Sequence, residues 1–266
     1  MIRATDGHRL QGEYDMDVIH VERHDQVAVL KLNRGVTNAL NSPLLHELAE
    51  HLRQMKGDSA VRALVLGSES EKFFSIGLDI PELFGLAQQD FSLFCQTFDR
   101  VCLDLYRWPK PTVAAIPGHA TAGGCILALC CDYRFITEGR KLMGLNEIKL
   151  GVPVPYPADC ILRQVVGTEN AREIMDTGEF YPPEKLLQMG MVDQVLPLDQ
   201  VLPKAIEKAR LEGALPDETF GLSKRSRVGK IEAQILERLA EQEQLFVERW
   251  YSDETRERLR EAMKKF

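Results

Sequence analysis

The hydrophobic pattern of the chain changes near Gly151, and this change limits the folds that it can adopt. Before Gly151, short apolar or alternating runs typical of strands take turns with longer runs that have helical spacing. The expected strands lie in residues 18–33 (two strands around a turn at 24–26), 61–68, 111–118 and 133–139. The expected helices between them are 41–55, 90–108 and 123–132. Strands that alternate with helices predict an α/β core with parallel strand pairing.

After Gly151 the sequence predicts helices only. They are expected at 159–167, 169–178, 182–190, 198–213 and 230–266. Ser252 or Asp253 can cap a new helix, so the last segment is expected to form two helices that meet near Tyr251. This charged, amphipathic pair cannot bury its apolar face alone, and it should pack on the core or on a neighbouring subunit.

Composition excludes several classes of function. The net charge of −7 gives the chain no general attraction to nucleic acid or to an anionic membrane. The first 17 residues carry acids and do not resemble a signal peptide, and no apolar run is long enough to span a membrane. The six cysteines form no C-x-x-C pair and have no histidine at zinc-ligand spacing. We therefore expect a reduced, cytoplasmic protein without a metal site.

Two glycine-containing turns could carry chemistry. They are "KFFSIGLDIPEL" (72–83) and "IPGHATAGGCILALCCD" (116–132), and each leads from a strand end into a helix. Two convergent backbone N–H groups at such turns can stabilise a developing oxyanion. Ordinary turns, in which glycine supplies a positive φ, are the simpler interpretation of both segments. On spacing alone a single Gly-Gly pair is weak evidence for an oxyanion hole.

Glu147 is an isolated acid in the apolar stretch "MGLNEIKLGVP" (143–153). In an apolar pocket its pKa would rise, which would make it a competent base with a usable conjugate acid near neutral pH. In a turn that faces solvent it would have no chemical role. The residues themselves favour neither alternative.

Other polar groups are weaker candidates. His119 is either a catalytic base or a polar loop residue. The basic cluster of Lys224, Arg225, Arg227 and Lys230 could bind phosphate, although a solvated helix face is the simpler interpretation. The chain lacks G-x-S-x-G, G-x-x-x-x-G-K-[ST], G-x-G-x-x-G and H-E-x-x-H motifs.

Five collinear segments resemble the crotonase superfamily, the enoyl-CoA hydratases and isomerases. They are "NALNSPLLHEL", "FFSIGLDIPEL", "PTVAAIPGHATAGGCILALCCDYRFITEG", "MGLNEIKLGVPVP" and "PPEKLLQMGMVDQVLPLDQV". The resemblance implies an α/β fold made of a spiral of ββα turns with C-terminal helices, assembled as a homotrimer or a dimer of trimers. Residues 1–195 would form the core that binds acyl-CoA and performs catalysis, and 196–266 a helical trimerisation region.

The resemblance also implies that the two turns form an oxyanion hole. Its donors would be the N–H groups of Ile76 and Gly123, and Ile76 replaces the small residue that is usual in the family. The substrate would be held by the first turn, by Gly124 and by Asn146; the residues of that turn are Ile76, Gly77, Leu78, Asp79 and Ile80. Asp79 is expected to hold the loop rather than to take part in the chemistry.

Family hydratases commonly use two glutamates, and this chain has Glu147 at one position but Ile126 at the other. An isoleucine cannot orient or deprotonate water. The motif "GLNE" resembles that of the Δ3,Δ2-enoyl-CoA isomerase branch, where one glutamate would move a proton from C2 to C4. No cofactor is implied beyond the CoA of the substrate. Hydration or another enolate reaction remains an alternative, as does a catalytically silent scaffold.

Overall fold

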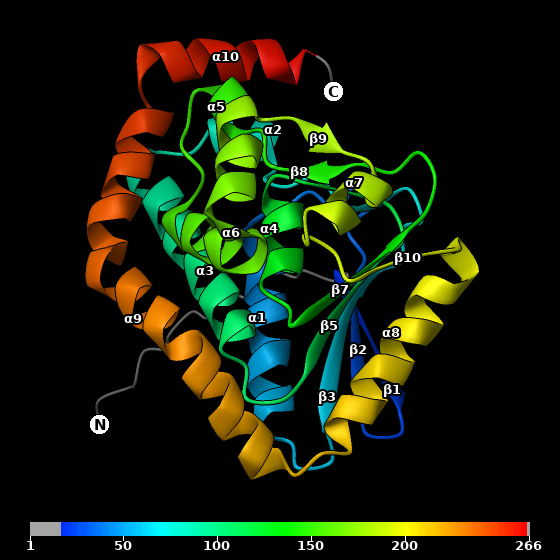
Figure 1. The fold of residues 1–266 in the computed structure, drawn as a ribbon. Helices are drawn as coiled ribbons and strands as arrows, with labels where there is room; N and C mark the ends of the chain where they lie inside the picture. Colours follow the sequence, from blue (N-terminus) through cyan, green and yellow to red (C-terminus); the bar gives the residue numbers. More distant parts are fainter. Residues whose placement is uncertain (1–16, 265–266) are drawn as a thin grey trace, which may run out of the picture.

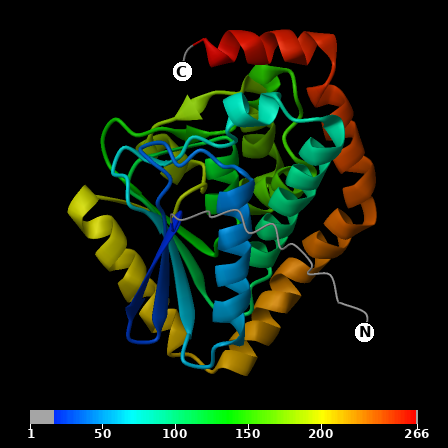
Figure 2. The same cartoon turned by 180° about the vertical axis from the view of Figure 1, so that it is seen from behind.

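The computed structural model describes residues 17–264. The N-terminal segment, which is expected not to be a signal peptide, therefore lies almost entirely outside the described part. In this part the strands form two sheets, and helices surround them (Figure 1). Both termini of the described chain are visible in Figure 2, where the first strand and the last helix lie far apart.

The large sheet has the spatial order β1-β2-β3-β5-β7-β10. Its strands are β1 (Ile19–His24), β2 (Val27–Leu32), β3 (Ala63–Ser68), β5 (Thr112–Ile116), β7 (Tyr133–Thr137) and β10 (Gln194–Leu196). The first two are antiparallel around a turn in which Asp25 has φ 55°, and all other neighbours are parallel. The central strands are buried on both faces, as parallel strands covered by helices must be.

The small sheet has the order β4-β6-β8-β9, and its first three strands are parallel. These strands are β4 (Phe73–Ser75), β6 (His119–Thr121), β8 (Met143–Gly144) and β9 (Phe180–Tyr181). Each of the first three follows a strand of the large sheet and leads into a helix: β3-β4-α2, β5-β6-α4 and β7-β8-α5. The chain therefore winds as a spiral of ββα turns, and the expected α/β spiral is confirmed.

The expectation that strands end at Gly151 is wrong. Strand β9 closes the small sheet and β10 closes the large one. They have only two and three residues, which is too short for an alternating pattern to appear in the sequence.

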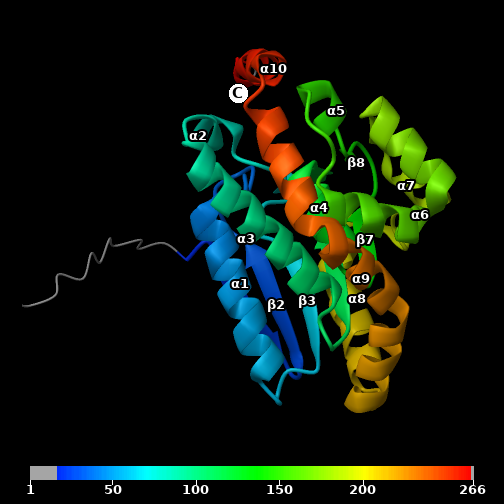
Figure 3. The same cartoon turned by 90° about the vertical axis from the view of Figure 1, so that its left-hand side faces the viewer.

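Helices cover both faces of the large sheet. On one face lie α1 (Ser42–Gly57), α3 (Gln88–Tyr106), α4 (Gly123–Leu129) and α6 (Tyr156–Thr177). On the other lies α8 (Leu198–Gly213), which packs on β3 and β5 over a second apolar cluster (Figure 3). Gly167, with φ 77°, divides α6 into the two helices that the sequence predicts.

The C-terminal helices pack on this chain's own core. The long helix α9 (Asp217–Trp250) lies along α3 and α6. Ser252 caps α10 (Asp253–Met263), as predicted, because its Oγ accepts a hydrogen bond from the N–H of Thr255. Helix α10 lies against the short helices α2 (Ile80–Phe84) and α5 (Glu147–Leu150) (Figure 1).

No helix in the described part is long and apolar enough to cross a membrane. The helix α7 (Pro183–Gln188) joins β9 to the large sheet.

Candidate active site

The two glycine turns lie against each other. The chain leaves β4 through Gly77, which has φ 92°, and enters α4 at Gly123 after Ala122, which has φ 48°. A Cβ atom on Gly77 would lie 2.8 Å from the amide nitrogen of Gly123, and one on Gly123 would lie 3.3 Å from the Cα of Gly77. Gly77 is required for its positive φ, which side chains other than glycine rarely adopt. Both glycines are required for the close approach of the two turns, because a Cβ atom on either would be too near the other turn.

The free backbone donor of the first turn is not the one that the resemblance implied. The N–H of Ile76 donates to the carbonyl of Thr37 at 3.0 Å, and the N–H of Gly77 donates to Ser75 Oγ at 3.1 Å. Among residues 17–264 the N–H of Leu78 has no partner. We therefore correct the predicted donor from Ile76 to Leu78, because the N–H of Ile76 is used to fix the turn.

The second predicted donor, Gly123, is the first residue of α4. Its N–H belongs to the first turn of the helix, where intrahelical acceptors are missing, and no acceptor is found for it within the described chain. Together with the N–H of Leu78, it can supply the pair of donors that an oxyanion hole needs.

Glu147 is a buried group and not an idle turn residue. It begins α5 directly after β8, its side chain is buried with only 6% of the residue exposed, and its Oε2 has no hydrogen-bond partner in the part of the chain that is described. Burial raises the pKa of Glu147 to about 7, against a smaller opposing effect of the backbone N–H groups at 146 and 147. A carboxyl with such a pKa can accept and return a proton near neutral pH.

A cavity of about 1070 Å³, here called the main cavity, brings these groups together. Leu78, Gly123 and Glu147 all lie on its wall, and so do Ile76 and Asn146. Much of the remaining wall is apolar; these residues include Ile80, Phe98, Leu150, Val152, Phe246 and Trp250. An apolar cavity with a few converging polar groups is the usual form of a site for a small molecule.

Three of the expected substrate-binding residues are not on this wall. Asp79 accepts a hydrogen bond from the N–H of Glu82 and forms an ion pair with Arg34 at 2.7 Å, so it holds the loop, as expected. Gly77 and Gly124 serve close packing instead: a Cβ on Gly124 would lie 2.3 Å from the carbonyl oxygen of Ser75.

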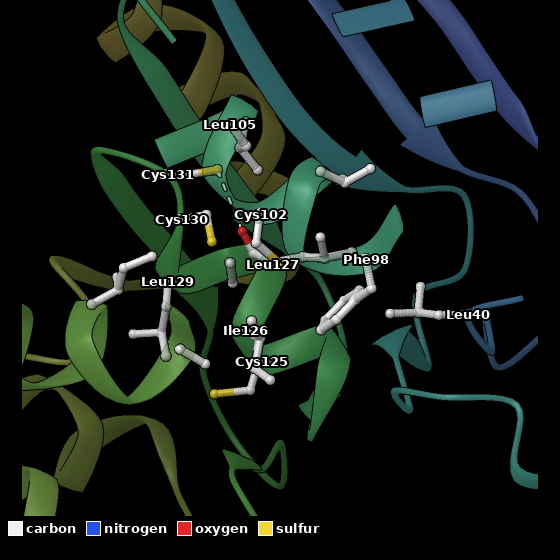
Figure 4. Close-up of a cluster of buried hydrophobic side chains, with 14 of the residues drawn as sticks. Leu40, Phe98, Cys102, Leu105, Cys125, Ile126, Leu127, Leu129, Cys130 and Cys131 are labelled. Carbon is white, nitrogen blue, oxygen red and sulfur yellow. Dashed lines mark hydrogen bonds between the residues drawn. The ribbon is translucent and has the colours of Figure 1, made fainter. Parts of the chain in front are cut away.

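Ile126 lies on the same wall as Glu147. It is 1% exposed and belongs to the apolar cluster that includes Phe98 and Cys125 (Figure 4). The other acids on the cavity wall are all on α10 and exposed to solvent; they are Glu254, Glu257 and Glu261. Glu147 is thus the only buried acid among the residues that line the main cavity.

His119 also lies on the cavity wall, but it is not placed to act as a base. Its Nδ1 accepts a hydrogen bond from the N–H of Leu142 at 3.1 Å, so in the neutral ring the proton is assigned to Nε2. Burial, followed by the charges of Lys141 and Lys72, lowers the pKa of His119. The ring is therefore a neutral hydrogen-bond donor at physiological pH.

The basic cluster does not form a phosphate site in the cavity. Lys224 is 3% exposed, and its Nζ lies 2.7 Å from Asp132 Oδ2, while Arg227 pairs with the other oxygen of Asp132. Arg225 and Lys230 are exposed on α9. The buried Lys224 and the exposed Arg227 thus join α9 to Asp132, which lies between α4 and β7.

The chain is similar over most of its length to known proteins of one family. The model of the enoyl-CoA hydratase/isomerase family matches residues 22–266. The chain is 34% identical to mouse mitochondrial enoyl-CoA delta isomerase 1 over 208 residues, which are 78% of this chain and 72% of the mouse protein. It is 35% identical to a probable enoyl-CoA hydratase of Bacillus subtilis over 178 residues, 66% of this chain and 68% of that protein. The crystal structure of human mitochondrial delta3-delta2-enoyl-CoA isomerase superposes with a TM-score of 0.90 at 30% identity, covering 94% of this chain and 98% of that one.

Proposed function

The chain belongs to the enoyl-CoA hydratase/isomerase family, and we propose that it acts as an isomerase that moves the double bond of a 3-enoyl-CoA from C3–C4 to C2–C3. The observation that carries this proposal is the single buried acid, Glu147, on the wall of a cavity that also presents two backbone donors.

In the proposed reaction the ionised carboxylate of Glu147 removes a proton from C2 of the thioester. The electron pair moves onto the thioester oxygen, which gives a dienolate. The N–H groups of Leu78 and Gly123 stabilise this oxygen, and each well-placed donor contributes on the order of 3–4 kcal/mol to the transition state. The neutral carboxyl then returns its proton at C4, and the electrons shift to form the C2–C3 double bond. The pKa of Glu147, about 7, suits both halves of this transfer.

Hydration is the second candidate, and the similarity to the Bacillus subtilis protein favours it. It requires a water molecule that is oriented and deprotonated next to the substrate. Ile126 supports isomerisation instead, because it occupies a buried part of the wall with a side chain that cannot bind or activate water. A silent scaffold would have no need for a buried, unpaired carboxyl, which is unfavourable for folding.

The test is to incubate purified protein with a 3-enoyl-CoA and, separately, with a 2-enoyl-CoA. We expect the first to become conjugated and the second to take up water slowly or not at all. Efficient hydration of the 2-enoyl-CoA would establish the second candidate, and turnover of neither would favour the scaffold.

Assembly, cofactor use and location belong to the same proposal. We expect a homotrimer or a dimer of trimers that forms through residues 196–266, without a cofactor other than the CoA of the substrate. Light scattering on the purified protein tests the assembly. The cytoplasmic location stays a prediction, since the mouse and human enoyl-CoA delta isomerases 1 to which the chain is similar are mitochondrial proteins.

A further inference from the structure

A second, much smaller cavity adjoins the main one between α3, α6 and α9, and is here called the small cavity. Its volume is about 20 Å³, which is enough for one group of the size of a water molecule. It shares Leu78, Phe98, Pro155 and Phe246 with the wall of the main cavity. Its other walls carry an unusual set of polar side chains for an apolar region: Asp99, Tyr156, Gln242 and Glu243.

Asp99 is the most informative of these side chains. It lies on the buried face of α3 and is 6% exposed, and no hydrogen-bond partner is found for its carboxyl among the residues described. Burial, and next the nearby Glu243, raises the pKa of Asp99 well above its ordinary value. This shift favours the protonated carboxyl, which presents an O–H donor. A buried donor without an acceptor is unfavourable by about 1–3 kcal/mol, so an acceptor that enters the small cavity would bind favourably.

Glu243 limits which acceptor fits. It lies on α9, is half-buried, and its pKa is raised by burial, with Arg100 opposing this shift. A second carboxylate brought into the cavity would lose its hydration and meet the carboxyl of Glu243, which is unfavourable. A hydroxyl group has no charge and can accept a hydrogen bond from Asp99 while it donates one to Glu243.

The position of the small cavity relates it to the substrate. Leu78 contributes its N–H to the proposed oxyanion hole and also lines the small cavity. Phe98 and Phe246 are apolar lining residues of both the main cavity and the small cavity. The shared lining residues place the small cavity next to the apolar wall along which an acyl chain bound at the oxyanion hole would extend.

We propose that the small cavity is a subsite for a hydroxyl group on the distal part of the acyl chain, with Asp99 as hydrogen-bond donor and Glu243 as acceptor. This inference rests on the proposed acyl-CoA function and narrows the substrate class to hydroxylated acyl-CoA thioesters.

The test is calorimetric binding of three series of saturated acyl-CoA ligands with matched chain lengths. One series ends in a methyl group, one carries a terminal hydroxyl and one a terminal carboxylate. At the best chain length the hydroxylated ligand should bind at least about tenfold more tightly than the methyl ligand, which is the effect of one satisfied buried hydrogen bond. The carboxylate ligand should bind more weakly than either.

Variants of Asp99 make the test specific. Asp99→Leu should reverse the order, so that the methyl ligand binds more tightly than the hydroxylated one. Asp99→Asn keeps a donor and should retain most of the preference for the hydroxyl. Asp90→Asn, at an exposed position of the same helix, serves as the matched control and should leave the ratio unchanged. Thermal unfolding of each variant verifies that it is folded.

The results separate this inference from the proposed function. If the methyl ligands bind and 3-enoyl-CoA is isomerised, but the hydroxyl brings no advantage at any chain length, the subsite inference alone is wrong. An unchanged ratio in Asp99→Leu has the same meaning. Failure of every acyl-CoA to bind would overturn both proposals.

Discussion

Ile126 and Glu147 lie in the wall of one cavity, the isoleucine on α4 and the glutamate at the first residue of α5. Both are buried, so the glutamate shares the buried part of the site with an apolar side chain and not with a second acid. This arrangement gives a base whose protonation is governed mainly by burial and not by a second acid, and it is the feature from which the isomerase proposal follows.

Ile126→Glu should raise the pH that isomerisation requires. A second carboxyl in the same low-dielectric cavity makes ionisation of both groups less favourable, so the acidic limb of kcat/KM should move above its wild-type position near pH 7. The matched control is Ile126→Gln, which adds a polar group of the same size without a charge. The pH profiles of the three proteins provide the measurement, and coinciding limbs for the wild type and Ile126→Glu would show that the two positions do not interact.

Glu147→Gln should stabilise the fold at alkaline pH and have little effect in acid. The folded-state pKa of Glu147 is raised from 4.5 to about 7, so the folded protein binds more protons than the unfolded chain between these values. The contribution of Glu147 to stability is therefore complete below about pH 4.5 and is lost as the pH rises through about 7. At pH 8 the variant should be more stable by up to about 3 kcal/mol.

The measurement is urea unfolding of wild type and Glu147→Gln at several pH values. Because Asp99 and other buried acids are present in both proteins, their effects cancel in the difference. A difference that does not depend on pH would mean that Glu147 is solvated in the folded state.

Gly77→Ala should abolish activity and destabilise the protein. The new Cβ would lie 2.8 Å from Ala122 Cβ and 2.8 Å from the amide nitrogen of Gly123, so the two turns would have to separate. We expect at least a 100-fold loss in kcat/KM, the effect of losing one oxyanion donor. The control is Gly139→Ala, where φ is 86° but no atom lies within 4 Å, so it carries the backbone strain alone. Equal losses of activity in the two variants would contradict a role for the contact between the turns.

Lys224→Met should test the structural assignment of the basic cluster. Lys224 is the buried partner of Asp132, whose Oδ2 also accepts hydrogen bonds from the N–H and hydroxyl of Thr112. Removing one partner of a buried ion pair lowers stability by about 3–5 kcal/mol, and we expect a loss at the lower end of this range because Arg227 still pairs with Asp132. The exposed Lys230→Met is the control and should change stability by less than about 0.5 kcal/mol. Loss of CoA affinity without loss of stability would contradict this structural role and would indicate that Lys224 binds a phosphate group.

The strands and helices with a clear hydrophobic period were predictable from the sequence. The parallel strands β3, β5 and β7 and the helix α1 are present as expected, because burial on both faces or on one stripe imposes a local pattern. The strands β9 and β10 were not predictable, since their pairing partners lie far away in the sequence and their length is set by the sheets they complete.

The site was predictable in part. The two glycine turns were found from their composition, but the free donor of the first turn depends on Thr37, a distant residue whose carbonyl engages the N–H of Ile76. The burial of Glu147 likewise depends on side chains that the local sequence does not reveal. Asp99 was missed, although its spacing from the buried Cys95 and Cys102 on α3 places it on the apolar face of that helix.

The rate of double-bond migration in Glu147→Gln tests the central claim most directly. Glutamine has nearly the same shape as glutamate but cannot accept the C2 proton, so the conversion of a 3-enoyl-CoA to its conjugated isomer should fall by at least about 100-fold, the lower range for loss of a general base. Binding of a saturated acyl-CoA to the variant should be retained, which verifies that the cavity is intact. A variant that isomerises the substrate within a few-fold of the wild-type rate would contradict the account, because the proton would then be moved by another group.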